Sequence, residues 1–251
     1  MILLKSPREL EHMRAAGRIL AEVKVLLQKL VKPGISTKEI DAEAEALIVS
    51  RGAVSAFKGY RGYPATVCAS INEEVVHGIP SPKRKLKDGD IIGLDMGCIV
   101  EGYYGDCAVT LPVGTVPARV RELIDVTRES LDKAIVQCRV GNRIGDISHA
   151  VQTHCESHGF GVVRSFVGHG IGRALHEEPQ VPNFGDAGRG PVLKAGMVLA
   201  IEPMVTMGSW EVQVLEDGWT AVTVDGSMAA HFEDTIAITD DGPDVLTRAA
   251  A

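Results

Sequence analysis

The organisation of this chain can be read outward from Ser165–Met204, SFVGHGIGRALHEEPQVPNFGDAGRGPVLKAGMVLAIEPM. This stretch holds two histidines seven residues apart, His169 and His176, and it ends with Glu202 before a proline. Glycines on both sides of His169 allow other backbone segments to approach it closely. Three carboxylates elsewhere in the chain are candidate partners for these residues: Asp95, Asp106 and Glu233.

The composition is that of one large globular domain or two small ones, with ample material for a core. The chain has 251 residues, of which 45% are hydrophobic and 24% are charged. A formal net charge of −7 gives no basic footprint for nucleic acid, and the short basic run at 83–87 (KRKLK) is interpreted as a solvated loop. We therefore expect no specific nucleic-acid partner.

The cysteines and the apolar runs indicate the compartment. The N-terminal apolar run is too short for a signal peptide, and no stretch of about 20 apolar residues could span a membrane. The five cysteines are odd in number and include no C-x-x-C pair, which argues against a disulfide framework or a zinc ribbon. Buried or pocket thiols in a reducing compartment are the better interpretation, so we expect a soluble cytoplasmic protein without a membrane partner.

Two helix starts are recognisable near the N-terminus. Ser6 is a candidate N-cap, Pro7 follows at the first helical position, and apolar residues recur at helical spacing as far as Leu30. Ser36, with a glutamate three residues later, predicts a second helix that ends at 51–52 (Arg-Gly).

A later segment repeats this phrase. The sequences at 31–53 (VKPGISTKEIDAEAEALIVSRGA) and 138–160 (CRVGNRIGDISHAVQTHCESHGF) align without a gap. Each follows a long helical pattern, and a single offset of this length does not suggest a solenoid. We predict one domain, 1–251, with two related halves at roughly 1–112 and 113–251 that face each other across a cleft. Chance similarity of two amphipathic helix pairs is the alternative.

Segments that read as strands follow each helix pair. The segments 91–100 and 103–111 flank the turn Glu101-Gly102 and predict a hairpin. Four further strands are predicted: Ala65–Ile71, Val198–Thr206, Trp219–Val224 and His231–Thr239. Helix pairs followed by mostly antiparallel strands indicate the α+β class.

Asp95 and Asp106 lie on the two arms of the predicted hairpin. With a two-residue loop, either register places them on one face, directly or diagonally opposite and within ~8 Å. Gly93 and Gly97 flank Asp95 on that face, so the strand offers Asp95 to a cavity. Two facing carboxylates repel unless a positive charge lies between them. The alternative is a pair of solvated aspartates on an exposed face.

Two more carboxylates complete a potential metal site. Glu233 lies on the polar face of the last predicted strand, and Glu202 lies near a strand end, before a proline. Two divalent cations would balance the four negative charges of the carboxylates. With the imidazole of His169, the set is oxygen-rich with one nitrogen and suits Mn²⁺, Fe²⁺, Co²⁺ or Zn²⁺. Two such ions about 3.5–4 Å apart can hold a bridging hydroxide and polarise a carbonyl, which is an arrangement for amide hydrolysis.

Six sequence motifs together identify a protein family more specifically than any one of them alone. They are GYP (62–64), INEEVVHGIP (71–80), IIGLDMGCIVEGYYGDCAVT (91–110), GHGIGRALHEEPQVPNF (168–184), LKAGMVLAIEPM (193–204) and HFEDT (231–235). In this combination, which covers nearly its whole length, the chain resembles type I methionine aminopeptidase. The resemblance implies the pita-bread fold, in which two pseudo-symmetric α+β halves surround a dinuclear metal site in a single catalytic domain.

The resemblance implies a role for each candidate ligand. Asp95 would bind one metal ion, and Asp106 and Glu233 would bridge both ions. His169 and Glu202 would bind the other ion. Glu202 would also be the general base that helps to deprotonate the bridging water.

Two further histidines acquire roles by the same resemblance. His77 and His176, which are not ligands in that family, would contact the substrate amide and stabilise the tetrahedral intermediate or assist the leaving nitrogen. On the residues alone, His77 would be interpreted as a loop histidine. Asn72 and Glu74 lie where backbone carbonyls bind a monovalent cation, Na⁺ or K⁺, in some relatives.

The resemblance also implies a pocket for a methionine side chain, whose sulfur contacts ring edges favourably. Three positions depart from the family pattern. Phe57 and Leu175 are expected to alter the shape of the pocket, whereas Asp234 lies on the buried strand face and needs a partner there. The matching lining residues are Tyr60, Tyr63, Cys68 and Trp219.

The implied activity is removal of the N-terminal methionine from nascent polypeptides when the next residue is small. A metal-bridging hydroxide would attack the first peptide bond. We expect a compact, monomeric, cytoplasmic enzyme without an N-terminal zinc-binding extension, acting on nascent chains at the ribosome. Three alternatives stay open: an X-Pro aminopeptidase or prolidase, which usually carries an extra N-terminal domain; a non-catalytic protein of the same fold that binds macromolecules; and a paralogue with poor activity.

Overall fold

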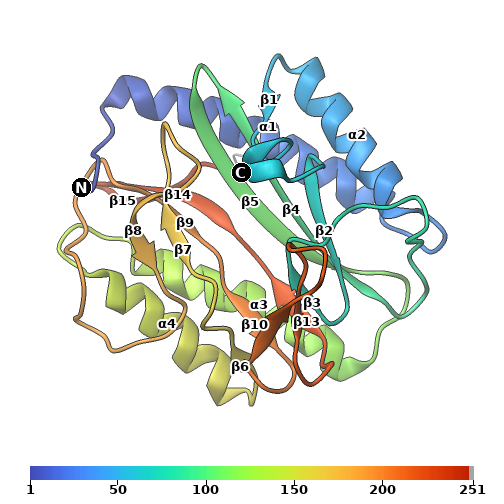
Figure 1. Ribbon diagram of the computed structural model, residues 1–251. Coiled ribbons are helices and arrows are strands. Elements are labelled where there is room, and N and C mark those ends of the chain that lie inside the picture. Colours follow the sequence, from blue (N-terminus) through green and yellow to red (C-terminus); the bar gives the residue numbers. More distant parts are fainter. Residues whose placement is uncertain (249–251) are drawn as a thin grey trace.

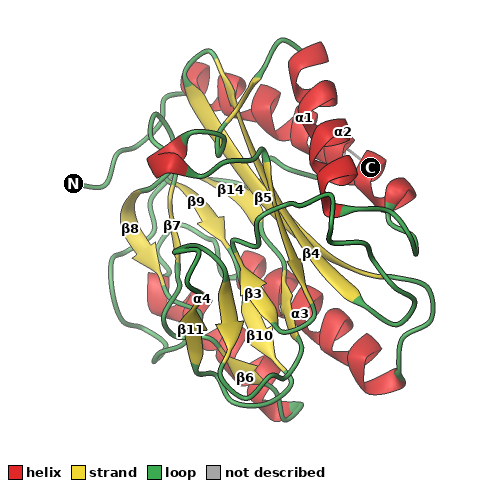
Figure 2. Ribbon diagram, turned by 45° about the vertical axis from the view of Figure 1, so that its right-hand side comes forward, coloured by secondary structure: helices red, strands yellow, loops and turns green. Residues whose placement is uncertain are grey.

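Two pairs of helices enclose the strands of this protein (Figures 1 and 2). The computed structural model describes residues 1–248. Helix α1 packs against the strands β4 and β5, and α3 packs against strands of the second half of the chain. The helices are α1 (Pro7–Leu30), α2 (Thr37–Ser50), α3 (Ala118–Val136) and α4 (Ile144–Ser157), with a short 3₁₀ turn, η1 (Tyr60–Gly62).

The predicted helix starts are confirmed. The side chains of Ser6 and Ser36 accept hydrogen bonds from the backbone of Glu9 and Glu39, whose carboxylates bond back to the cap residues. Each of these capping boxes satisfies two backbone donors, and an N-cap of this kind stabilises a helix by about 1 kcal/mol. The second helix ends at Ser50, before Arg51 as expected.

The repeat is visible in the backbone. Helix α4 begins and ends 107 residues after α2. Gly34 and Gly141, which occupy equivalent positions, have φ angles of +92° and +95°, a conformation that glycine adopts without strain. The same offset relates two isolated strand pairings, Ser36 with Lys85 and Arg143 with Val192. The predicted pseudo-symmetry is therefore present in the structure, and the boundary near residue 112 stays a prediction.

The strands pair in an antiparallel manner, which confirms the α+β class. Within residues 1–248 they form four sheets. The first contains β1 (Val54–Ser55), β2 (Val67–Ile71), β4 (Ile91–Val100) and β5 (Tyr103–Pro112); the second contains β6 (Gly161–Val162), β10 (Met204–Thr206) and β13 (Ala229–His231). The third contains β3 (Glu74–Val76), β11 (Val212–Val214) and β12 (Ala221–Thr223); the fourth contains β7 (Gly168–Gly170), β8 (Glu177–Val181), β9 (Val198–Ile201), β14 (Asp234–Thr239) and β15 (Gly242–Val245).

The hairpin β4–β5 has one of the two predicted registers. Asp95 faces Ala108 and Gly97 faces Asp106, so the two aspartates are diagonal neighbours on one face. A Cβ atom on Gly97 would lie 2.9 Å from the ring of Phe57. The glycine therefore leaves room for an aromatic side chain beside the aspartates.

Two strands predicted as continuous are broken, and the prediction was wrong there. The segment 198–206 divides into β9 and β10 around Pro203, which has no N–H to donate to the sheet. The segment 231–239 divides because Glu233 leaves the strand and exchanges two backbone hydrogen bonds, of 3.0 and 3.1 Å, with Ala108 of β5. Both breaks occur at or beside a predicted ligand.

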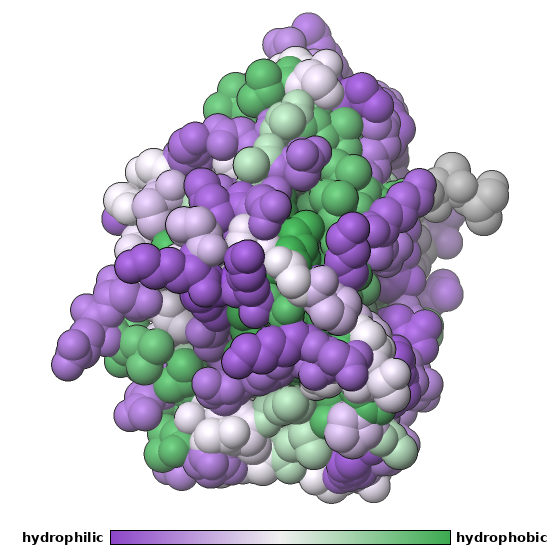
Figure 3. Space-filling model, turned by 90° about the vertical axis from the view of Figure 1, so that its right-hand side faces the viewer, coloured by the Kyte–Doolittle hydropathy of each residue, from purple (hydrophilic) through white to green (hydrophobic). Residues whose placement is uncertain are grey.

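The surface and the core agree with the composition. All five cysteines are buried and free, as predicted. Within residues 1–248, no helix has the length and apolar character needed to cross a membrane. Hydrophilic residues cover most of the face shown in Figure 3, with hydrophobic residues visible towards its centre.

Candidate metal centre

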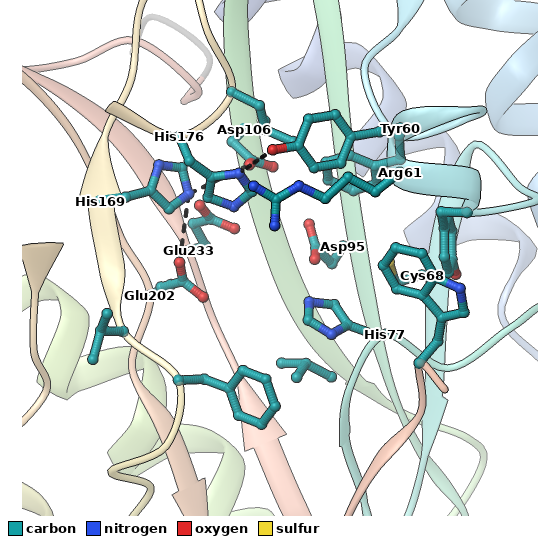
Figure 4. Close-up of a pocket in the computed structure, with 17 residues that line it drawn as sticks. Tyr60, Arg61, Cys68, His77, Asp95, Asp106, His169, His176, Glu202 and Glu233 are labelled. Atoms are coloured by element: carbon teal, nitrogen blue, oxygen red, sulfur yellow. Dashed lines mark hydrogen bonds and ion pairs between the residues drawn. The ribbon is translucent and has the colours of Figure 1, made fainter. Parts of the chain in front are cut away.

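The predicted ligands come from five different segments and line one cavity of about 230 Å³ (Figure 4). Two are contributed by the first half of the chain and three by the second. They are Asp95 on β4, Asp106 on β5, His169 on β7, Glu202 directly after β9, and Glu233 directly before β14. The convergence of segments so distant in sequence is what the hypothesis of a metal site requires.

Three of these residues form the closest group. Asp106, His169 and Glu233 each place one donor atom within 4.8 Å of the others. The Nε2 atom of His169 is 3.6 Å from Glu202 Oε1 and 3.9 Å from Asp106 Oδ2. Its Nδ1 atom lies 2.9 Å from the carbonyl oxygen of Gly170, which can only accept a hydrogen bond. The proton is thus on Nδ1, and the lone pair of Nε2 faces the carboxylates.

Within residues 1–248, the four carboxyl groups of this cluster form no ion pair with a lysine or an arginine, and only imidazoles lie beside them. Within the described chain, one oxygen each of Asp95, Asp106 and Glu233 is buried and has no hydrogen-bond partner. Burial raises the pKa of Glu202 to about 8, and burial together with the charge of Glu202 raises that of Asp95 to about 7. Such a group is costly unless cations neutralise it. The orphaned oxygens and the one imidazole therefore fit the divalent cations that the sequence predicted.

Glycines and a threonine fix the positions of the ligands. A Cβ atom on Gly168 would lie 2.5 Å from the carbonyl oxygen of Ala200, so only glycine lets β7 approach β9 closely beside His169. On the other side, Thr235 Oγ1 donates to the carbonyl oxygen of Asp106 (2.7 Å) and accepts from its N–H (3.0 Å). These contacts hold the strands that carry the ligands in place before any ion binds.

Two histidines that are not in the ligand set lie at the edge of the same cavity. The Nδ1 atom of His176 lies 2.9 Å from the hydroxyl oxygen of Tyr60, which leaves Nε2 free. His77 has a φ of +63°, an uncommon conformation for a residue with a side chain. Its ring is half-buried at 5.5 Å from the ring of Phe166, and burial lowers its pKa to about 4. His77 is therefore a neutral imidazole near neutral pH, and burial together with the charge of Arg61 also lowers the pKa of His176.

Apart from Arg61, the remainder of the cavity lining is mainly apolar and aromatic. The hydroxyl of Tyr63 donates to the carbonyl oxygen of Gly78 (3.0 Å), and its ring meets that of Trp219 edge-on at 5.1 Å. Burial raises the pKa of the Cys68 thiol, so this side chain is a small neutral group. All six residues predicted for the methionine pocket line the cavity: Phe57, Tyr60, Tyr63, Cys68, Leu175 and Trp219.

Sequence reasoning missed several residues of the site. Arg61, Val76, Phe166 and Val167 also line the cavity. In addition, the buried His231 places Nε2 at 3.6 Å from Glu202 Oε2. Arg61 lies in a turn, where no periodicity distinguishes one side chain from the next.

Asp234 is not part of the site, and the structure supplies the partners that the sequence could not. Its carboxylate accepts hydrogen bonds from Lys24 Nζ (3.0 Å), Thr247 Oγ1 (2.7 Å) and Arg248 Nε (2.7 Å). A buried aspartate is stable only in such a paired environment.

The comparison with known proteins decides the family. The model of metallopeptidase family M24 matches residues 11–240. The chain belongs to metallopeptidase family M24. It is 55% identical to methionine aminopeptidase 1 of Bacillus subtilis over 248 residues, which cover 99% of this chain and 100% of that protein. It is 52% identical to the methionine aminopeptidase of Clostridium acetobutylicum, over 98% and 99% of the two chains.

Solved structures of the M24 family confirm the predicted pita-bread fold. The crystal structure of methionine aminopeptidase from Thermotoga maritima has a TM-score of 0.98 and 49% identity, and covers 99% of this chain and 100% of that chain. The prolidase of Pyrococcus furiosus, at 22% identity and a TM-score of 0.78, shares the fold over 66% of its own length. The resemblance to methionine aminopeptidases, inferred from six phrases, is thus confirmed across the chain.

Proposed function

We propose that this M24 protein removes the N-terminal methionine from polypeptides whose second residue is small. One observation carries the proposal: an apolar pocket and a cluster of unneutralised carboxylates share a single cavity. The pocket suits a methionine side chain, and the cluster suits the metal ions of a hydrolytic site. High identity to methionine aminopeptidases over the whole chain supports this proposal.

The metal ions would be held by the five convergent residues. When bound, two divalent ions supply an activated water for attack on the first peptide bond and polarise its carbonyl. Co²⁺, Mn²⁺, Fe²⁺ and Zn²⁺ are all compatible with this donor set. The ligands are Asp95, Asp106, His169, Glu202 and Glu233.

Three side chains would handle protons and hold the substrate. Glu202, whose burial favours proton uptake, accepts a proton from the attacking water. His176 is oriented by Tyr60 through Nδ1, so that Nε2–H can donate to the carbonyl oxygen of the substrate. His77, on the other rim, contacts the substrate amide and assists the departing nitrogen.

The aromatic end of the cavity would hold the methionine side chain. Trp219 and Tyr63 present ring edges and faces to it, and Cys68 adds a small polarisable wall. Phe57 and Leu175, both buried, complete the lining. These two departures from the family pattern reshape the pocket without opening it.

The remaining partners are part of the same proposal. The substrates are N-termini of new chains, which places the reaction at or near the ribosome in the cytoplasm, and the enzyme acts as a monomer. The backbone carbonyls of Asn72 and Glu74 are proposed to bind Na⁺ or K⁺.

The test uses two tripeptides and the metal-stripped protein with Mn²⁺ or Co²⁺ added back. We expect metal-dependent release of methionine from Met-Ala-Ser, none from Met-Leu-Ser, and no cleavage of Ala-Pro-Ser. Cleavage of Ala-Pro-Ser alone would instead identify an X-Pro peptidase. Metal binding without cleavage of any peptide would contradict the proposal and favour a non-catalytic protein.

A further inference from the structure

Arg61 is a charged residue of the cavity lining that has no role in the reaction described above. Arg61 lies in the turn η1, between glycines with φ angles of +87° (Gly59) and +89° (Gly62), and has itself a φ of +47°. A residue with a side chain rarely adopts this conformation, and such outliers cluster at ligand sites. In this turn the chain directs the side chain of Arg61 across the cavity (Figure 4).

The guanidinium of Arg61 is not neutralised. Within residues 1–248, Arg61 makes no ion pair, and its guanidinium lies over the ring of Tyr60, at 5.4 Å from the centroid. A neighbouring cation differs in this respect, because Lys58 is paired with Glu45 at 2.5 Å. Among the described residues that line the cavity, Arg61 is the only lysine or arginine.

The position of Arg61 is at the opening of the cavity. Of the seventeen lining residues, only Arg61 and His176 are exposed. A polypeptide whose first peptide bond lies among the carboxylates must therefore leave past this cation.

The dimensions of an extended peptide indicate which residues of the substrate approach Arg61. An extended chain advances about 3.3–3.6 Å per residue, so the third and fourth residues lie about 5 Å and about 8–9 Å beyond the first peptide bond. We propose that Arg61 determines substrate preference beyond the second residue, by favouring polypeptides with acidic side chains at positions three and four. This inference rests on the proposed aminopeptidase function and adds a subsite to it.

The test compares three peptide amides on the metal-loaded enzyme: Met-Ala-Glu-Glu, Met-Ala-Gln-Gln and Met-Ala-Lys-Lys. The amide removes the terminal carboxylate, which would otherwise give every peptide a negative charge. An exposed ion pair changes kcat/KM by about two- to fivefold. We expect that factor between the Glu and Gln peptides and again between the Gln and Lys peptides at 20 mM salt, and a smaller factor at 300 mM.

Variants assign the preference to the residue. The ratio of Glu to Lys peptides should fall to about one in Arg61→Gln and should invert in Arg61→Glu. Lys58→Gln removes the same charge three residues away and should keep the wild-type ratio. Equal cleavage of all three peptides by the wild type, or an unchanged ratio in Arg61→Gln, would overturn the inference. Absence of methionine release from every peptide would instead contradict the aminopeptidase function itself.

Discussion

Replacement of Asp234 by alanine should destabilise the protein far more than a typical substitution of a charged residue. Asp234 is 2% exposed and pairs with Lys24 and Arg248. Its loss leaves the ammonium of Lys24, whose side chain is 15% exposed, without a carboxylate. Arg248 is affected less, because it is 42% exposed and keeps a second ion pair with Asp132 at 2.7 Å.

The magnitude follows from the burial of the pair. Removal of one partner of a buried ion pair costs about 3–5 kcal/mol, mostly because the other charge stays buried. Since Lys24 retains some access to solvent, we expect about 3 kcal/mol for Asp234→Ala. Substitution of both partners, Lys24→Met with Asp234→Leu, should recover most of that loss, because a hydrophobic pair of similar volume often replaces a buried ion pair without cost.

The assay is urea unfolding followed by circular dichroism, at pH 7 and one fixed Mn²⁺ concentration, because bound metal contributes to the measured stability. Asp244→Ala is a matched control: Asp244 lies on the adjacent strand β15 and pairs with Arg14 on the surface. We expect it to cost less than about 1 kcal/mol. A loss below about 1 kcal/mol in Asp234→Ala as well would refute the reasoning.

Three further predictions concern the site. The pKa values of Asp95 and Glu202 are raised to about 7 and 8, so the metal-free folded chain binds more protons than the unfolded chain. Its free energy of unfolding should therefore fall from pH 6.5 to pH 8. The expected slope is about 1.4 kcal/mol per pH unit for each extra bound proton. Tyr60→Phe removes the hydrogen bond to His176 and should lower kcat for Met-Ala-Ser about tenfold, with KM little changed. Glu233→Gln, which mimics the protonated carboxyl, should leave metal-free stability nearly unchanged but reduce metal content and the thermal shift that Mn²⁺ produces.

Controls distinguish these effects from general damage. The pH range starts at 6.5 because His77 and His169 have pKa values lowered to about 4, and below that pH their protonation in the unfolded chain acts in the opposite direction. Saturating Mn²⁺ should abolish the decline, and a flat profile without metal would count against the buried carboxylates as its cause. An unchanged kcat in Tyr60→Phe would show that the hydrogen bond from Tyr60 to Nδ1 does not orient His176 for catalysis. Binding of two ions per chain by Glu233→Gln would show that Glu233 is not a required metal ligand.

Local signals in the sequence predicted much of the architecture. The starts of α1 and α2 were visible as caps, because the Ser-to-Glu capping pattern depends on residues three apart. The two-residue turn limited the hairpin to two registers, and both place Asp95 and Asp106 on one face, as the structure shows. The helix-pair repeat was also visible, because it needs only a constant offset.

Features that depend on contacts between distant residues were not predictable. Apolar alternation continues through Glu233, so it gave no indication that this residue leaves its strand to pair with Ala108. The partners of Asp234 lie at opposite ends of the chain, at Lys24 and Arg248. Arg61 was missed because a turn carries no periodicity, and the left-handed backbone at Gly59, Arg61 and Gly62 is known only from the structure. Recognition of the methionine pocket depended on resemblance and not on spacing.

The two related halves have a consequence for how substitutions could affect activity. One backbone plan occurs twice, but the first half contributes only Asp95 and Asp106 to the proposed ligand set, and the second half contributes His169 and the two glutamates. Neither half alone contains the complete proposed ligand set, so the proposed centre forms only where the two halves meet. A displacement of about 1 Å between reacting groups can cost a hundredfold in rate. Substitutions at Ala108 or Glu233, which join the two halves, should therefore abolish activity while both halves stay folded. A screen that measures only solubility would not detect such variants.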